Sequence, residues 1–322
     1  MPRRDQLLAL LVAVVWGVNF LAIDLGLRDS PPLVLVALRF VFVAFPLVLF
    51  VRRPNVPWRV IAAIGLFQSA GQFGLLFTAM HLGLPTGLAP VILQSQMVFT
   101  ILIAAIALRE RPTIAQLAGA AVGVLGLGIV GAGRASGVEG AAALVPLLVC
   151  VAAGLSWGIG NVVSRAARQS DGFAMVVWSA VFVPVPVLLA SLALDGPAAV
   201  GEALGSIGWE TVASLLYMSG LASLVGYSIW NSLLARHPAG LVSPFTLLIP
   251  PIGLGAAWLV LGERPNALEL AGCAVLVAGV ALGQLRRAPG RDGGAGRDGG
   301  AGPTTGGAPR SRRSGPAVAP MR

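Results

Sequence analysis

Residues 7–27 read LLALLVAVVWGVNFLAIDLGL, an almost uninterrupted apolar stretch in which Asp24 is the single charged residue. A bilayer core about 30 Å thick is crossed by roughly 20 mostly apolar residues in helical form. Helices are the expected spanning form, because every backbone polar group must find a partner within the lipid. The stretch therefore predicts a first membrane span.

Nine more stretches of this kind come after it, with short polar connectors between them. Of the 322 residues, 56% are hydrophobic and 11% are charged, and the mean hydropathy is +0.85. Soluble domains carry about 25% charged residues, so this composition excludes a water-soluble enzyme, a nucleic-acid-binding domain and a secreted disulfide scaffold. The sequence predicts an all-α membrane protein with ten transmembrane helices, at about 7–27, 32–51, 60–80, 85–108, 113–131, 141–163, 173–194, 209–233, 239–261 and 266–285.

The net charge of +9 is unevenly distributed along the chain. All 22 basic residues are arginines, and eight of them lie in residues 286–322, which read as a disordered, basic Gly/Arg-rich tail. With the N-terminus inside, twelve arginines fall on the inner side and three, Arg28, Arg134 and Arg264, fall outside. Because cytoplasmic loops carry the basic excess, both termini are predicted to be cytoplasmic in a multi-pass protein of the cell (plasma or inner) membrane. Membrane lipid is an expected partner, and nucleic acid is not.

The two halves of the chain repeat each other. Leu108-Arg109-Glu110-Arg111-Pro112 recurs as Leu261-Gly262-Glu263-Arg264-Pro265, at an offset of 153 residues. Five spans in each half force the second half to insert upside down, and inverted repeats are typical of secondary transporters. The expected organisation is two inverted five-helix repeats, residues 1–131 and 141–285, followed by the tail at 286–322.

Proline and glycine predict two local features of the bundle. Pro244 and the pair Pro250-Pro251 remove backbone donors, which predicts a break in the ninth span. GxxxG spacings in the fifth and tenth spans predict close helix packing, at Gly119 and Gly123 and at Gly279 and Gly283.

The motifs as a set resemble the EamA family of the drug/metabolite transporter superfamily. The likeness is carried by Trp16-Gly17-Val18-Asn19-Phe20, by Pro31-Pro32-Leu33 with Leu38-Arg39-Phe40, and by the two Glu-Arg turns with a glycine-rich span after each. Further segments, such as Leu93-Gln94-Ser95-Gln96 and Gly226-Tyr227-Ser228-Ile229-Trp230, are most similar to bacterial exporters of O-acetylserine and cysteine. The resemblance implies ten helices and export of small amino-acid metabolites, driven by an ion gradient.

Polar side chains in the middle of spans are costly in lipid and usually face a cavity or a neighbouring helix. Gln68 and Gln72 are four residues apart, which places them on one helical face. Neutral amides and hydroxyls with aromatic walls suit a small zwitterion or another polar metabolite, although the same groups also link helices by hydrogen bonds. The candidate substrate-binding set is Trp16, Asn19, Gln68, Gln72, Gln94, Gln96, Thr100, Trp157, Trp178, Ser223 and Tyr227.

Asp24 and Arg39 are the ionisable residues that lie well inside spans, both toward the outer ends of adjacent helices. One interpretation is a structural ion pair between them. The other is that Asp24 couples transport to protons, because no other carboxylate lies as deep. The family often carries lysine where Asp24 stands, so the resemblance transfers no role to that position.

Other classes of function fit less well. An intramembrane enzyme needs a nucleophile–base pair or metal ligands, whereas His81 and His237 are predicted at opposite membrane edges, so we expect no enzyme. Cys150 and Cys273 lie in apolar runs without ligand-like neighbours, so no metal site and no cofactor is expected. The alternatives that remain are a drug or nucleobase-type exporter on the same fold and a non-transporting scaffold or receptor. A homodimer is left open.

Overall fold

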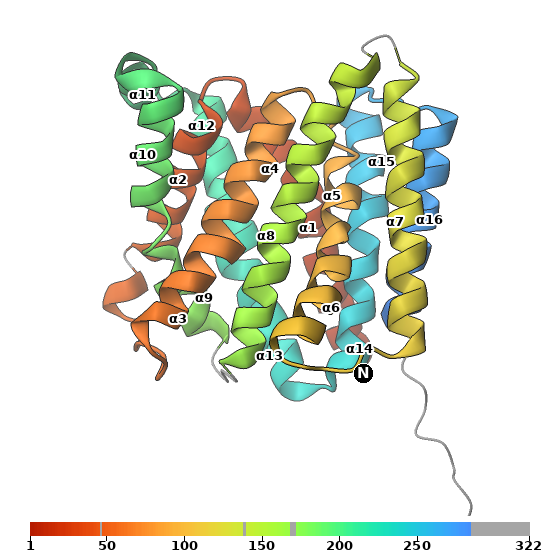
Figure 1. Ribbon diagram of the computed structural model, residues 1–322. Helices are drawn as coiled ribbons and strands as arrows, with labels where there is room; N and C mark the ends of the chain where they lie inside the picture. Colours follow the sequence, from red (N-terminus) through yellow and green to blue (C-terminus); the bar gives the residue numbers. More distant parts are fainter. Residues whose placement is uncertain (46, 138–139, 168–171, 285–322) are drawn as a thin grey trace, which may run out of the picture. The chain divides into compact units, whose positions relative to one another are not determined.

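The computed structural model describes residues 1–45, 47–137, 140–167 and 172–284, and these residues form helices and no strand. Ten helical segments among them are long and apolar enough to cross a membrane, which confirms the predicted spans. The expected disorder of the tail at 286–322 lies outside the described residues. In chain order the spans are α1 (Arg3–Leu27), α2 (Pro32–Ala44) with a 3-10 turn at Leu47–Leu49, α3 (Trp58–Ile64) with α4 (Gln72–His81), α5 (Ala89–Ile92) with α6 (Gln96–Ala107), α7 (Ile114–Ala135), α8 (Leu144–Ala166), α9 (Gly172–Ala180) with α10 (Pro184–Leu194), α12 (Trp209–Leu215) with α13 (Gly226–Arg236), a 3-10 stretch at Ser243–Leu248 with α15 (Ile249–Leu261), and α16 (Ala267–Gln284) (Figure 1). The short helix α14 (Ala239–Val242) comes directly before the ninth span.

The two halves of the bundle start on opposite sides. Figure 1 shows α1 beginning at the edge marked N and α8, preceded by a 3-10 turn at Gly140–Ala143, beginning at the other edge. We call the edge where α1 begins the N-terminal edge and the other the opposite edge. This arrangement supports the inverted relationship of the two repeats, which stays a prediction.

Four spans contain a π-helical or 3-10 stretch between helical segments, and they hold corresponding places in the two halves. The seventh span is also broken, between α9 and α10. The third and eighth spans carry π-helical stretches at Gly65–Gly71 and Leu216–Val225. The fourth and ninth carry 3-10 stretches at Leu93–Ser95 and Ser243–Leu248. The predicted break in the ninth span is therefore confirmed, with α15 beginning just before Pro250. Irregular backbone at membrane depth is tolerated where it is buried in protein or lines a cavity, so these turns indicate where a site lies.

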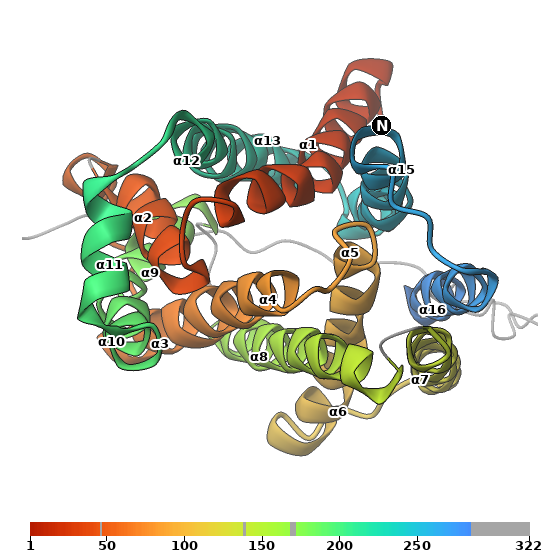
Figure 2. The same ribbon diagram turned by 90° about the horizontal axis from the view of Figure 1, so that it is seen from above.

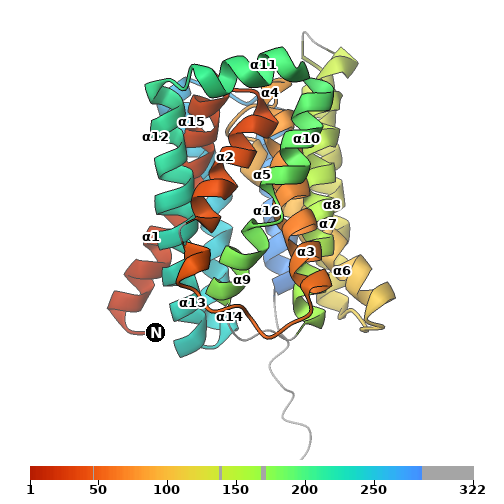
Figure 3. The ribbon, with the colours of Figure 1, turned by 90° about the vertical axis from the view of Figure 1, so that its left-hand side faces the viewer.

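One helix was not expected from hydropathy. The segment between the seventh and eighth spans forms α11 (Gly196–Gly205), which lies across the opposite edge between α10 and α12 (Figure 3). Val200 and Ala203 on its inner side are buried against Val34 of α2. The helix therefore covers the ends of the spans on that edge.

Apolar side chains fill the inside of the bundle, and other large apolar side chains are exposed on its outside. The main core includes Leu35, Phe77 and Ile92, each fully or almost fully buried. Leu7 and Ile106 expose 65% and 82% of their surface, as expected for side chains that face lipid hydrocarbon.

The backbones of α7 and α16 approach each other closely. Figure 2 shows these helices side by side, and glycines line the contact on both. A Cβ atom added at Gly119 would lie 2.6 Å from the carbonyl oxygen of Gly279, and one added at Gly279 would lie 2.5 Å from the amide nitrogen of Gly123. The predicted close packing of the GxxxG glycines is confirmed, because only glycine leaves room for the facing backbone.

We expect Gly126→Val to destabilise the protein by about 3 kcal/mol, the upper range for overpacking, because its side chain would meet the backbone of α16. A Cβ atom there would lie 2.7 Å from the Cα of Leu276 and 2.9 Å from the carbonyl oxygen of Gly272. Thermal unfolding in detergent measures the effect. The matched control is Gly128→Val on the same helix, where an added Cβ meets nothing within 4 Å. Equal unfolding temperatures for the two variants would contradict the packing argument.

Candidate functional site

A cavity of about 280 Å³ lies between the second, third, sixth, seventh and eighth spans. Ser164 near the end of α8, Gly172 at the start of α9 and Leu234 near the end of α13 lie on its wall, so it extends toward the N-terminal edge (Figure 1). Both π-helical stretches contribute to it, through Gln68 and Ser223. Its polar side chains are Arg39, Gln68, Ser69, Ser164, Ser179, Ser223, Tyr227 and Asn231.

Within the part of the chain that the structure describes, Arg39 is the one cation on this wall, and only 3% of its surface is exposed. Its guanidinium carbon lies 4.1 Å from the centroid of the Phe73 ring, within cation–π range. Its Nη2 donates to the hydroxyl of Ser223 at 3.2 Å, and its Nη1 lies 3.9 Å from the sulfur of Met218. Its Nε is buried without a hydrogen-bond partner, and among the described residues it forms no ion pair.

Asp24 does not pair with Arg39, so the structural ion pair, one of the two interpretations of these residues, is not formed. Its carboxylate instead accepts from Arg28, one helical turn further on at 3.2 Å, and from the hydroxyl of Thr86 at 3.3 Å. The two helices carry Asp24 and Arg39 toward different partners, because an i,i+4 arginine competes for the carboxylate. Asp24 lies toward the opposite edge and does not line the cavity.

A network of amides lies where α8 meets the third and fourth spans. The Asn161 amide donates to the side-chain oxygen of Gln96 at 2.8 Å and to the hydroxyl of Thr100 at 3.2 Å. Gln68 in turn donates to the Asn161 oxygen at 3.1 Å and accepts from the Ser164 hydroxyl at 3.2 Å. The network brings three of the candidate residues together, and it holds Gln68 on the cavity wall.

The candidates Gln72 and Gln94 do not line the cavity, unlike Gln68. Gln68 is in the π-helical stretch and lines the cavity, whereas Gln72 begins α4, is buried and does not line it. Of this pair, only Gln68 therefore lies on the cavity wall. Gln94 lies in the 3-10 stretch of the fourth span, also away from the cavity wall.

The aromatic candidates separate into groups. The Trp16 ring lies 5.1 Å from Tyr227 and 5.3 Å from Trp230, and its indole donates to the carbonyl oxygen of Ala222 at 2.9 Å. Tyr227 and Trp230 line the cavity directly, with Trp16 behind them. Trp178 is elsewhere, with its ring 5.7 Å from that of Trp58 and its indole donating to the carbonyl oxygen of Val51.

Two candidates remain away from the wall. Trp157 packs against the main core. Asn19 is buried with its side-chain oxygen unpartnered, outside the set that lines the cavity.

Sequence reasoning missed Asn161, Ser164 and Asn231 as site residues. Asn161 falls within the repeat of the Trp-Gly motif, and this position was the available signal. Asn231 lines the cavity with its side-chain nitrogen buried and unpartnered, and a Cβ on Gly172 would approach its oxygen to 2.7 Å. No periodicity indicated that the end of α13 and the start of α9 meet.

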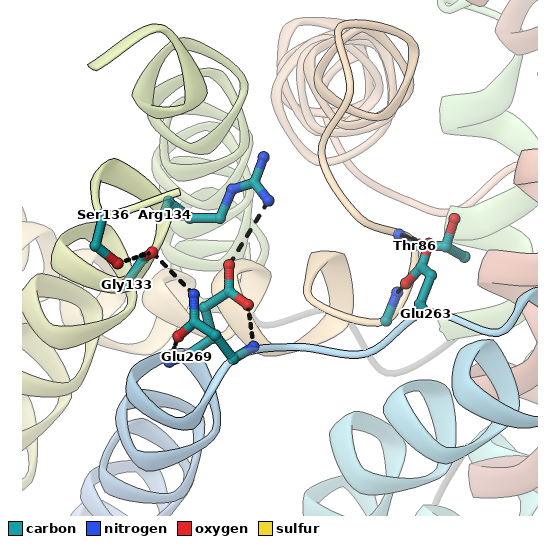
Figure 4. A network of polar contacts seen from close by, with 8 residues as sticks. Thr86, Gly133, Arg134, Ser136, Glu263 and Glu269 are labelled. Atoms are coloured by element: carbon teal, nitrogen blue, oxygen red, sulfur yellow. Dashed lines mark hydrogen bonds and ion pairs between the residues drawn. The ribbon is translucent and has the colours of Figure 1, made fainter. Parts of the chain in front are cut away.

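At both edges of the bundle, carboxylate side chains form hydrogen bonds or ion pairs between different spans. At the opposite edge, Glu263 accepts from the backbone amides of Thr86 and Gly87, both at 2.8 Å, while Glu269 lies 3.6 Å from the guanidinium of Arg134 (Figure 4).

At the N-terminal edge the carboxylates bind side chains instead of backbone. Glu110 accepts from Arg165 at 2.7 Å, and Asp5 binds Arg236 at 3.1 Å and His237 at 2.6 Å. Within the described residues no group of three or more His, Cys, Asp or Glu side chains lies close enough to hold a metal ion.

The sequence of this chain is similar to those of known membrane transporters. The EamA-like transporter family matches the chain twice, over residues 5–132 and 144–283. The chain is 40% identical over 284 residues to a probable amino-acid metabolite efflux pump of Salmonella typhimurium, covering 87% of this chain and 94% of that protein. It is 39% identical, with the same coverage, to the pump of that description in Escherichia coli. It is 29% identical to a probable terminal-alkyne amino-acid exporter of Streptantibioticus cattleyicolor, over 87% of this chain and 96% of that one.

A solved crystal structure shares the fold, with a TM-score of 0.56, 22% identity, and coverage of 88% of this chain and 96% of that one. Each of the two matched segments covers five of the ten spans, so the family match extends over the whole membrane bundle. The family and the relatives' names are those of transporters, which implies a membrane-embedded protein with a small-molecule substrate. The chain is a multi-pass membrane protein that belongs to the EamA-like transporter family.

Proposed function

We propose that the protein is a secondary active exporter of small polar metabolites, amino acids such as cysteine and O-acetylserine, and that it works by alternating access. The observation that carries the proposal is the cavity, in which amides, hydroxyls and one buried cation meet four aromatic side chains, those of Phe40, Phe73, Tyr227 and Trp230. The names of the relatives at 40% and 39% identity, amino-acid metabolite efflux pumps, support this substrate class.

The size of the cavity favours a small substrate. At about 280 Å³ it lies just below the usual volume of ligand sites, roughly 300–1,000 Å³. A free amino acid fills such a space, whereas a large drug does not. The small volume of the cavity therefore favours small metabolites over the larger substrates of multidrug exporters.

The position of the cavity fits the direction of transport. It extends toward the N-terminal edge, while α11 and the Glu263 hydrogen bonds lie at the opposite edge. If the termini are cytoplasmic, as the arginine distribution predicts, this conformation takes up substrate from the cytoplasm. An exporter loads its substrate from that side.

Charge separates this proposal from the alternatives. Arg39 is positive and no carboxylate of the described residues lines the cavity, so a cationic drug would meet an uncompensated like charge. A neutral nucleobase is compatible with the aromatic wall and remains the second candidate because Tyr227 and Trp230 offer flat faces.

A counterflow assay in proteoliposomes tests the function. We expect vesicles loaded with cysteine or O-acetylserine to accumulate labelled cysteine, whereas loading with a purine or a cationic dye leaves uptake at background. Empty vesicles and protein carrying Gly126→Val are the controls. Accumulation of a labelled purine by purine-loaded vesicles, without accumulation of labelled cysteine, would favour the nucleobase exporter. No counterflow of any labelled solute would favour the non-transporting scaffold.

Asp24→Asn tests proton coupling. If Asp24 carries the proton, the variant retains counterflow of labelled cysteine but loses uptake driven by a proton gradient into inside-out vesicles. The control is Asp29→Asn, an acidic residue just beyond the end of the same helix. Full gradient-driven uptake by Asp24→Asn would assign the residue a structural role, through its bonds to Arg28 and Thr86.

A further inference from the structure

The buried guanidinium of Arg39 has too few partners for its charge. A guanidinium has five N–H donors, and hydrogen bonds within the described residues account for two of them, one to a hydroxyl and one to a sulfur. Both acceptors are neutral. A buried charge without a counter-ion costs several kcal/mol, and such residues inside a membrane protein usually mark a ligand or ion path.

The surroundings of Arg39 hold its side chain in place without neutralising it. The hydroxyl of Ser219 donates to the backbone carbonyl of Arg39 at 3.1 Å, so the contact between α2 and the eighth span does not depend on the charge. The ring of Phe73 lies against the guanidinium plane. A pre-positioned, unpaired guanidinium is the group that recognises a carboxylate by two parallel hydrogen bonds.

We propose that Arg39 binds the carboxylate of the transported substrate, so that a negatively charged carboxylate is required for recognition. This rests on the proposed function and narrows its substrate class. A second hydrogen-bond donor without a partner, the side-chain nitrogen of Asn231, lies on the cavity wall away from Arg39. It lies eight residues along from Ser223, roughly 12 Å by helical rise, so the two donors occupy different levels of the cavity. The faces of Tyr227 and Trp230 between them suit the substrate's ammonium group.

The test compares cysteine with cysteamine, which lacks the carboxylate, and with cysteine methyl ester, which lacks its charge. In counterflow by the unaltered protein we expect both analogues to compete at least about 30-fold less well than cysteine, since losing one partner of a buried charge pair costs that much or more. Arg39→Gln removes this difference by weakening cysteine competition to the level of the analogues. Arg39→Lys retains part of it.

The matched control is Arg53→Gln. Arg53 also lies over an aromatic ring, 4.6 Å from the centroid of Trp58, but it does not line the cavity. The difference between cysteine and cysteamine should be unchanged in that variant. Unfolding temperatures without substrate establish that each variant is folded.

Three outcomes separate the proposals. If the unaltered protein exchanges cysteine and the analogues compete equally well, the carboxylate requirement is wrong whether or not any variant folds. If Arg39→Gln keeps the 30-fold difference, another residue binds the carboxylate. If the unaltered protein exchanges no amino acid at all, the proposed function fails and this proposal fails with it.

A second inference comes from the Glu-Arg-Pro turns. The offset of 153 residues that relates Glu110 to Glu263 also relates Pro85-Thr86-Gly87-Leu88 to Pro238-Ala239-Gly240-Leu241. Glu263 binds the backbone amides of Thr86 and Gly87 at the opposite edge. Its counterpart Glu110 binds Arg165 at 2.7 Å, with both side chains about half exposed. The two halves thus hold equivalent carboxylates in different contacts.

We propose that Glu110 is a latch for the other transport state. When the N-terminal edge closes, its carboxylate leaves Arg165 and accepts from the backbone amides of Ala239 and Gly240. Opposed repeats support this exchange, because alternating access moves one repeat against the other around a fixed site. Charge-assisted hydrogen bonds to backbone amides are strong enough to bias such an equilibrium.

Labelling of a cavity cysteine tests the latch. In a background where both native cysteines are alanine, Leu234→Cys reports access from the N-terminal face to a membrane-impermeant maleimide. We expect Arg165→Gln, which frees Glu110, to lower the labelling rate about threefold or more, and adding Glu110→Gln to restore it. Glu202→Gln on α11, an exposed carboxylate at the opposite edge, is the control.

Unchanged labelling in Arg165→Gln, or a reduction that persists in the double variant, would contradict the latch. A cross-link provides an independent measurement. Glu110→Cys with Ala239→Cys puts a thiol at each of the two latch positions and should form a disulfide in the closed state. A rate equal to that of Glu110→Cys with Glu202→Cys would also contradict the proposal.

Discussion

The structure depends on the requirement that backbone amides and carbonyls be hydrogen-bonded where no water is available. Regular helices meet this requirement over most of the ten spans. π-Helical or 3-10 stretches interrupt the third, fourth, eighth and ninth spans, at corresponding places in the two halves. Two of these stretches, Gly65–Gly71 and Leu216–Val225, supply residues to the cavity wall. The irregular backbone is thus used where a substrate site needs polar groups.

The low polarity of the membrane interior also decides which partners the charged side chains need. Carboxylates near the edges have cationic or backbone partners, as Asp5 has Arg236 and His237, and Glu263 has two amides. Arg39 in the interior has only neutral partners among the described residues. The contrast makes Arg39 the most informative residue of the bundle, since a structural role would have been met more cheaply by an apolar side chain.

Much of the fold could be predicted because it follows from hydrophobic length. Ten apolar stretches, the proline break before Pro250 and the glycine contacts of Gly119 and Gly279 all depend on local chemistry. Helix α11 was not predicted, because a segment of ten weakly apolar residues is too short to span a membrane and resembles a loop in sequence. The spacing of Gln68 and Gln72 did not tell which of them lines the cavity, because Gln72 is buried among neighbouring spans that lie far away in the sequence.

The sequence by itself determined the membrane class, the number of spans, the repeat and the family, since each depends on composition or on motifs at fixed spacing. It also supplied a set of polar and aromatic candidates. Only the tertiary structure decided which of them meet: Gln68, Ser223 and Tyr227 on one cavity wall, Gln96 and Thr100 behind it through Asn161, and Asp24 with Arg28 rather than Arg39. The physical reason is that partners of a polar group in lipid are chosen by helix rotation and packing between distant segments, which no single stretch of sequence records.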